Sequence, residues 1–195
     1  WAAIAIENAR TYSRMQDRRD ELERTVASFE ATTEISHALA GDTDLEHVLE
    51  LTVKRGRALT DARAMVLLLE EGQDLVVAAL AGDLDDALLG ERIPVQESIS
   101  GDVLRSGKAE RLADAPSRLR FALAKQTQAE TGLFVPLRFR GRALGVLAAF
   151  DRLREGPQFS EGDERLLSAF ATSAAAAVAT AQDVAAQGSQ RSLAA

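Results

Sequence analysis

The sequence predicts an α+β domain in which an antiparallel sheet carries long helices on one face and short capping helices on the other. Runs of alternating or continuous apolar residues come in two adjacent pairs, as expected for antiparallel hairpins. Stretches with apolar residues at i, i+3 and i+4 precede and follow those pairs, which indicates amphipathic helices at both ends of the chain. Short, capped segments separate the two pairs. Helices gathered in this way outside the strand runs are typical of α+β folds.

The clearest strand pair spans residues 133–150, LFVPLRFRGRALGVLAAF. Its first half alternates, with Val135 and Leu137 on one face and Arg138 on the other, whereas residues 144–150 are almost continuously apolar. Alternation indicates one solvated face, and a continuous apolar run indicates burial on both faces. Gly141 stands at the turn, where a positive φ is needed. We therefore expect the second strand of this hairpin to be central in the sheet.

The remaining elements follow from the same patterns. Thr43 and Glu46 fit a capping box that starts a helix whose apolar stripe ends at Leu59. Strands are predicted at residues 64–70, 75–81, 92–95 and 110–113, and further helices at 98–107, 117–127 and 163–184. Ser98 and Gly107 suit the two ends of the first of these helices, since Ser favours the N-cap and Gly the C-cap.

The first 40 residues predict one long helix. Its apolar residues recur at heptad spacing, as in a coiled coil: Tyr12, Met15, Leu22, Val26 and Phe29. The seam is imperfect because Arg19, Thr33 and Ser36 interrupt it. We expect this helix to pair with its copy in a parallel homodimer; the alternative is a helix folded back on its own domain. The predicted organisation is a linker helix at residues 1–26, one domain at 27–182, and a linker or disordered tail at 183–195.

Composition excludes several classes of function. The net charge of −7 argues against binding to nucleic acid and to anionic lipid surfaces. The chain contains no cysteine, which excludes disulfides, cysteine-ligated metal and thiol chemistry. No signal peptide is visible, and the longest uncharged run, residues 166–182, is too rich in Ala, Ser and Thr for a membrane span. We therefore expect a cytoplasmic protein without direct membrane insertion.

The order of elements and three motifs resemble a GAF domain, whose fold is related to PAS domains. The motifs are SISGDVLRSGKAERLAD (residues 98–114), the hairpin at 133–150 and FSEGDERLLSAFATSAAAAV (residues 159–178). The resemblance covers residues 27–181. Residues 2–12, AAIAIENARTY, are similar to the end of the last helix of another GAF domain. The resemblance therefore implies the second GAF module of a bacterial sensor histidine kinase.

The resemblance also implies a place for a small ligand, between the sheet and the short middle helices. Its candidate lining residues are Met65, Ile99, Val103, Leu104, Phe121, Leu123 and Phe134. The alternative is a filled apolar core without a ligand.

Cyclic-nucleotide-binding GAF domains carry Asn-Lys, a spacer and Phe-x-x-x-Asp-Glu. Phe159, Asp163 and Glu164 match the second half of that motif, whereas Asp151 and Arg152 depart from the first half. We interpret Arg152 and Asp163 as a structural clasp between the last strand and the last helix. An exposed pair of this kind contributes at most about 1 kcal/mol to stability.

No cofactor and no metal are predicted. Haem-binding members need a histidine in the pocket region, whereas the two histidines of this chain, His37 and His47, precede it. Attachment of a bilin through a thioether and reduction of methionine sulfoxide both require cysteine, which is missing. The acidic loop with Asp83, Asp85 and Asp86 is interpreted as a solvated loop. No catalytic motif is present, so the chain itself is not expected to be an enzyme, although the full-length protein is expected to be a kinase.

The sequence thus predicts a non-enzymatic sensory or signal-relay GAF domain that dimerises through helices and acts on a downstream output. Two alternatives stay open. One is a regulatory module of a phosphatase or diguanylate cyclase that binds a cyclic nucleotide or another small molecule. The other is a purely structural dimerisation spacer.

Overall fold

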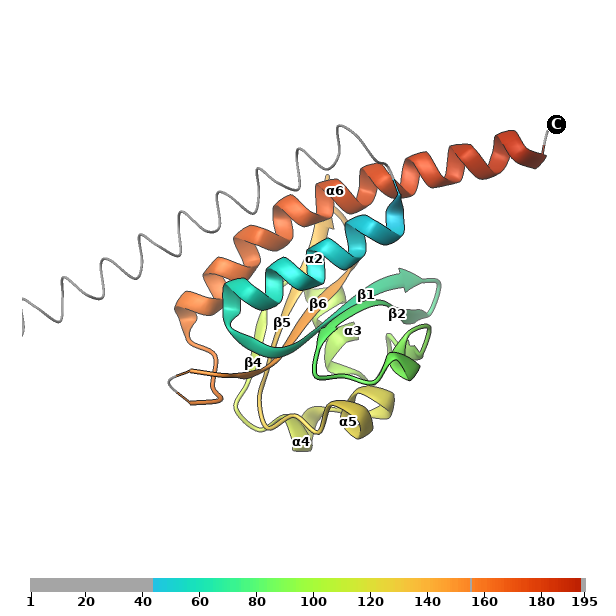
Figure 1. Ribbon diagram of the computed structural model, residues 1–195. Helices are drawn as coiled ribbons and strands as arrows, with labels where there is room; N and C mark the ends of the chain where they lie inside the picture. Colours follow the sequence, from blue (N-terminus) through green and yellow to red (C-terminus); the bar gives the residue numbers. More distant parts are fainter. Residues whose placement is uncertain (1–43, 155, 194–195) are drawn as a thin grey trace, which may run out of the picture.

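The computed structural model describes residues 44–154 and 156–193, and within them the chain forms one curled antiparallel sheet with helices on both faces (Figure 1). The strand order is β3-β2-β1-β6-β5-β4. The strands are β1 (Ala62–Glu71), β2 (Asp74–Gly82), β3 (Arg92–Pro94), β4 (Glu110–Leu112), β5 (Gly132–Phe139) and β6 (Arg142–Arg152). The predicted fold class is confirmed.

Strand β6 lies at the centre of the sheet, as its continuous apolar sequence predicts. It pairs with β1 on one side and β5 on the other, so that Leu147 faces Leu67 and Val135. Arg140 and Gly141 form the two-residue turn between β5 and β6, with φ values of 50° and 81°. Two positive φ values identify a type I′ turn, whose twist matches that of the flanking strands.

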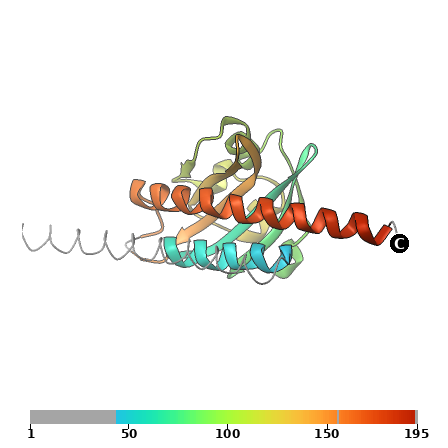
Figure 2. The ribbon, with the colours of Figure 1, turned by 90° about the horizontal axis from the view of Figure 1, so that it is seen from above.

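Helices α2 (Leu45–Thr60) and α6 (Glu161–Leu193) cover one face of the sheet. They run side by side in opposite directions (Figure 2). The buried stripe of α2 includes Val48, Leu49 and Val53, and that of α6 includes Leu167 and Phe170. We call the core between these helices and the sheet the helix-face core.

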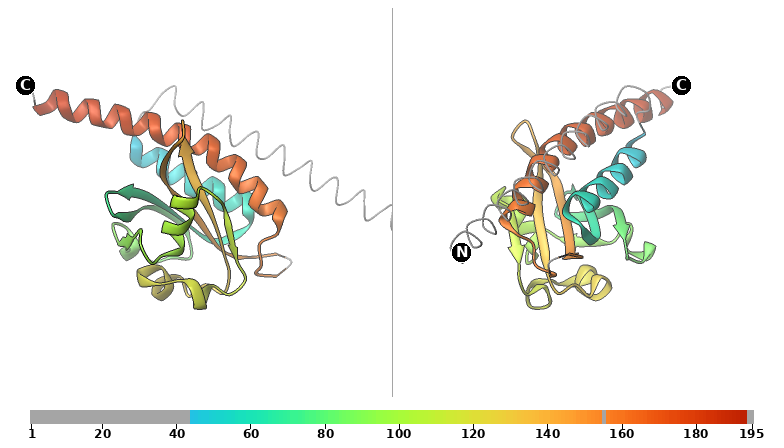
Figure 3. Two further views of the ribbon diagram at one scale, coloured as in Figure 1. Left: turned by 180° about the vertical axis from the view of Figure 1, so that it is seen from behind. Right: turned by 60° about the vertical axis from the view of Figure 1, so that its left-hand side comes forward.

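The other face of the sheet is covered by short elements (Figure 3). They are α3 (Ile99–Ser106), the 3-10 turn η1 (Asp86–Leu88), α4 (Ala115–Arg118) and α5 (Phe121–Thr127). Phe134 and Phe150 meet edge to face beneath them, with ring centroids 5.8 Å apart. We call this second apolar cluster the cap-face core. Layers on both faces explain why β1, β5 and β6 contain long apolar runs.

Three predicted boundaries are wrong. Helix α2 is capped by Asp44, whose Oδ1 accepts a hydrogen bond from Glu46 N at 3.2 Å, and not by Thr43. The helix predicted at 117–127 is two helices, because Leu119 is extended, with φ −71° and ψ 139°. The last helix starts at Glu161 and continues to Leu193, well beyond the predicted end at 184.

The predicted dimer helix with Tyr12, Met15, Leu22, Val26 and Phe29 lies outside the described residues, as does the boundary at residue 26. In the part of the chain that is described, no helix has the length and apolar character needed to cross a membrane.

Candidate functional site

Five of the seven residues predicted to line a ligand pocket come together on the cap face. Ile99, Val103 and Leu104 lie on α3, Leu123 on α5 and Phe134 on β5, and all five belong to the cap-face core. Each is at most 5% exposed. These five residues are therefore part of an apolar layer between the sheet and the short helices.

Met65 does not belong to this group, which corrects its predicted role. Its side chain lies in the helix-face core with Phe170, and its Sδ is 2.6 Å from where a Cβ on Gly56 would be. Its neighbours Ala64 and Val66 take the cap face instead. Because β1 is buried on both faces, its continuous apolar sequence does not reveal which set of alternate residues faces which layer.

Phe121 is also not part of the apolar cap. Its side chain is 43% exposed, and its backbone has a φ of 62° at the start of α5. The break between α4 and α5 replaces the single helix at 117–127 to which both Phe121 and Leu123 were expected to contribute apolar side chains. A positive φ is strained for an aromatic residue, so this position is conformationally costly.

Ser100 is a polar residue of the cap that sequence reasoning missed. It is fully buried in α3, and its Oγ finds no hydrogen-bond partner among the described residues. A buried hydroxyl without a partner costs about 1–3 kcal/mol relative to a satisfied one. A serine inside the apolar stripe between Ile99 and Val103 was the available signal.

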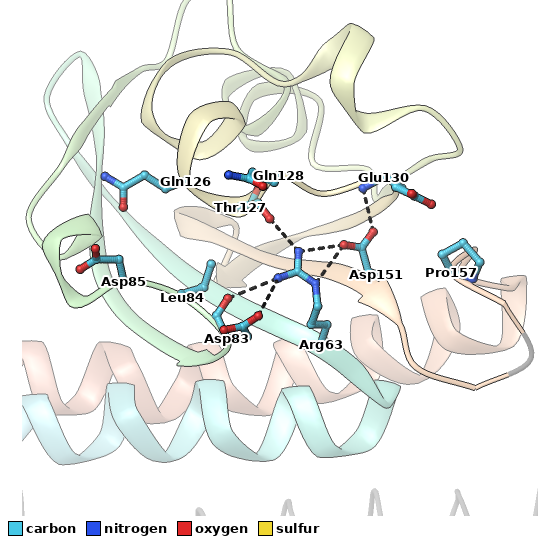
Figure 4. A pocket seen from close by; sticks show the side chains of 10 residues that line it. All are labelled: Arg63, Asp83, Leu84, Asp85, Gln126, Thr127, Gln128, Glu130, Asp151 and Pro157. Atoms are coloured by element: carbon cyan, nitrogen blue, oxygen red, sulfur yellow. Dashed lines mark hydrogen bonds and ion pairs between the residues drawn. The ribbon is translucent and has the colours of Figure 1, made fainter.

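A polar groove of about 620 Å³ opens at the end of the sheet where β1 begins and β6 ends (Figure 4). Its centre is Arg63, whose guanidinium points between Asp151 and Asp83. The groove is lined by Arg63, Asp83, Leu84, Asp85, Gln126, Thr127, Gln128, Glu130, Asp151 and Pro157. None of these residues was predicted as part of a site.

The hydrogen bonds of Arg63 are already taken up by the protein. Nε and Nη2 donate to Asp151 Oδ2 at 3.1 and 2.8 Å, and Nη2 also donates to the Thr127 carbonyl at 2.7 Å. Nη1 donates to the Asp83 carbonyl at 3.3 Å. The guanidinium therefore has little capacity left for an anionic ligand. We interpret the floor of the groove as a structural junction that joins α5 to the sheet.

Asp151 completes this junction from the opposite side. Its Oδ1 accepts hydrogen bonds from the backbone N–H groups of Glu130 and Thr131, both at 2.9 Å. Its φ of 48° lies in the left-handed region, which Asp tolerates better than most residues. The chain separation of 88 residues between Arg63 and Asp151 left no sequence signal for the pair.

The structure brings Arg152 and Asp163 together, with Arg152 Nε 3.6 Å from Asp163 Oδ2. The two side chains are only 8% and 3% exposed, so the expected exposed setting is wrong. Asp163 Oδ2 also accepts hydrogen bonds from Ser160 N and Ser160 Oγ, at 2.8 and 2.7 Å. Ser160 Oγ in turn accepts from Asp163 N at 3.2 Å, which makes a capping box at the start of α6.

The other candidate residues are dispersed. His47 is exposed on α2, and His37 lies outside the described residues. Asp85 caps η1 by accepting a hydrogen bond from Ala87 N at 2.9 Å. Within the described ranges, no group of three His, Asp or Glu side chains is placed to hold a metal ion. On α2, a hydrogen bond from Lys54 lowers the pKa of Glu50, which is not among the groove residues.

Comparison with known proteins identifies the family. The model of the GAF domain family matches residues 42–179, so the chain belongs to the GAF family. GAF domains are sensory and regulatory modules found in diverse signalling proteins. The matched region contains the sheet, the cap and the first part of α6.

Solved structures share this fold. The GAF domain of a phosphoenolpyruvate-protein phosphotransferase from Coxiella burnetii is 24% identical, with a TM-score of 0.69 over 83% of this chain and 98% of that chain. Free methionine-R-sulfoxide reductase from Neisseria meningitidis is 21% identical, with a TM-score of 0.64 over 80% and 91%. The GAF-B domain of DevS from Mycobacterium smegmatis is 25% identical, with a TM-score of 0.59 over 75% and 99%.

Proposed function

We propose that this GAF domain is a non-enzymatic relay in a multidomain sensor protein, most simply a sensor histidine kinase. In this proposal the domain works as a homodimer held by helices. A change at the cap or in a preceding domain alters the pairing of those helices, and α6 carries the change to an output module. The tandem organisation suggested by residues 2–12 supports the kinase context.

The observation that carries the proposal is the course of α6. The helix starts at the capping box of Ser160 and the buried Asp163, and packs on the sheet through Ala181. From Asp183 to Gln187 its side chains are exposed, while the helix continues to Leu193. A rigid helix that is anchored in the domain and extends past it is suited to transmit a displacement.

The test of the dimer is sedimentation velocity of the 195-residue chain over a range of concentrations. We expect a dimer that Leu22→Glu with Val26→Glu converts to monomer, because two charges would enter the apolar seam. A matched control, Ala27→Glu with Ala31→Glu, adds the same two negative charges outside the seam and should leave the dimer intact. A monomer at every accessible concentration contradicts the helical relay.

Ser100 favours a second candidate function, the binding of a small molecule under the cap. A ligand with a polar group could satisfy the unpartnered Oγ and repay the cost of burying it. Melting curves with cyclic AMP and cyclic GMP test this directly, since a ligand that binds only the folded state raises the melting temperature. A rise in melting temperature that disappears in Ser100→Ala supports binding of that nucleotide under the cap. The lack of any rise excludes cyclic AMP and cyclic GMP as ligands.

A third candidate, the structural spacer, is separated from the relay by filling the cap. Enlarging Val103 to Phe should disturb signalling by a relay that senses its cap. A spacer should tolerate the same change, provided that circular dichroism shows a folded protein.

A further inference from the structure

The tip of the β5–β6 hairpin carries an unusual concentration of positive charge. Lys108 follows α3, Arg140 lies in the type I′ turn, and Arg138 and Arg142 lie on either side of it; all four side chains are exposed. The guanidinium of Arg138 lies directly over Gly107, since its Nη1 is 1.8 Å from where a Cβ on Gly107 would be. This contact brings the segment around Lys108 to the hairpin. We call these four residues the basic tip.

The charges of the basic tip are not neutralised within the described part of the chain. Arg138 Nη2 donates to the Gly141 carbonyl at 3.2 Å, and Arg140 lies over the ring of Phe139, 5.1 Å from its centroid. Neither contact involves a carboxylate. The neighbouring β1–β2 turn is acidic, but its Glu71 and Asp74 pair with Arg92 at 2.7 and 3.3 Å.

This arrangement contrasts with the rest of the protein. The whole chain has a net charge of −7, and its other arginines in the described ranges include many that pair with acids, such as Arg63, Arg105 and Arg111. Four like charges on one tip repel one another and gain nothing from folding. Arg138 and Arg140 are also held in place by their contacts, so that little conformational freedom remains to be lost on binding.

We propose that the basic tip is a docking surface for an acidic segment of a partner protein. Each of the three arginines has a planar guanidinium that can donate two parallel hydrogen bonds to one carboxylate, which a lysine ammonium does not do. A short acidic segment fits better than a nucleic acid or an anionic membrane, because the net negative chain is repelled by extended polyanions. Phe139, between two of the arginines, packs against the helix-face core, so a partner on the tip would lie next to the layer that contains α6.

The test is fluorescence anisotropy with a short fluorescein-labelled peptide of alternating glutamate and serine, titrated with the full chain. We expect binding that weakens with added salt and falls by about tenfold or more in the triple variant Arg138→Gln, Arg140→Gln, Arg142→Gln. A matched control, Arg105→Gln, Arg118→Gln, Arg154→Gln, removes the same net charge elsewhere and should stay within about twofold of the unaltered chain.

Arg142→Glu provides a second test that leaves the contacts of Arg138 and Arg140 in place. It should also weaken binding of the peptide by several-fold. Equal losses in the tip and control variants, or no loss in either, would overturn the proposal. Tighter binding to phosphatidylserine vesicles or to single-stranded DNA than to the peptide would also overturn it. This outcome is independent of the dimer measured by sedimentation.

Discussion

Arg63 and Asp151 hold each other across the β1–β6 pair, with Arg63 Nη2 2.8 Å from Asp151 Oδ2. They lie between the cross-strand pairs Ala62–Arg152 and Ala64–Phe150, at the end of the two central strands. Arg63 also binds the carbonyl at the end of α5, and Asp151 binds the backbone at the start of β5. One side-chain pair therefore joins the cap to both halves of the sheet.

Replacement of Arg63 by Ala should lower the free energy of unfolding by about 2 kcal/mol, since it leaves a largely buried Asp151 with one charged partner fewer. Urea denaturation followed by circular dichroism measures this loss. Arg92→Ala is the control, because Arg92 is 56% exposed and its ion pairs should contribute less than about 1 kcal/mol. Equal effects of the two substitutions would contradict the central role of Arg63.

Gly145→Ala should be far more damaging than its small size suggests. A Cβ at this position on β6 would be 1.9 Å from the Leu68 carbonyl oxygen on the adjacent strand, so the central strands would have to separate. We expect a loss of more than about 3 kcal/mol, or no folding. Gly72→Ala is the matched comparison: its φ is +67° but nothing lies within 4 Å, so only backbone strain of about 1–2 kcal/mol applies. A milder effect at Gly145 than at Gly72 would argue against this close approach of β1 and β6.

Asp163→Ala removes the Asp163 half of the capping box and a carboxylate next to Arg152. We expect a loss of about 3 kcal/mol, because the buried Arg152 would lose a carboxylate neighbour and Ser160 would lose its acceptor, although Ser160 Oγ still accepts from the backbone N–H of residue 163. Glu164→Ala serves as the control at the next position. Its pair with Arg111 is exposed and should contribute less than about 1 kcal/mol. Thermal melting of both variants measures the difference. Similar melting temperatures would show that the pair of Arg152 and Asp163 contributes little to stability.

Glu50 gives a prediction for pH. A hydrogen bond from Lys54, followed by the charge of Lys54, lowers its pKa in the folded protein. A lowered folded-state pKa means that the stabilisation is present above the unfolded-state pKa and is lost as pH falls through the folded-state value. Lys54→Gln should therefore raise the pKa of Glu50 and remove a small acid-sensitive part of the stability. NMR titration of the Glu50 carboxyl resonance measures the change; an unaltered titration curve would contradict it.

The sequence was sufficient to predict the layers of the fold because each layer leaves a local pattern. The apolar run of β6, the turn at Gly141 and the caps Ser98 and Gly107 all depend on residues within a few positions of one another. The structure confirms the central position of β6, the positive φ at Gly141, and the placement of Ser98 and Gly107 at the ends of α3.

The details that the sequence did not reveal depend on contacts between segments distant in the chain, or on which residues of a buried element face which layer. Met65 was assigned to the wrong face because both faces of β1 are apolar. Phe121 was assigned to the cap because nothing in residues 117–127 signalled the extended conformation of Leu119. The pair of Arg63 and Asp151 forms only when two segments 88 residues apart in the chain come together in the fold. Local patterns carry no information of that kind.

The sheet order β3-β2-β1-β6-β5-β4 divides the strands into an early half and a late half that meet only along β1 and β6. During synthesis, β1 is made well before β6, because the cap elements and β5 lie between them in the chain. The central β1–β6 pairing therefore forms late and closes a long loop. The same seam makes the domain a candidate for fragment complementation. A break between α3 and β4 would leave three strands on each piece, and their reassembly would report on the β1–β6 pairing together with the packing of α2 on α6 and of α3 on β5 and β6.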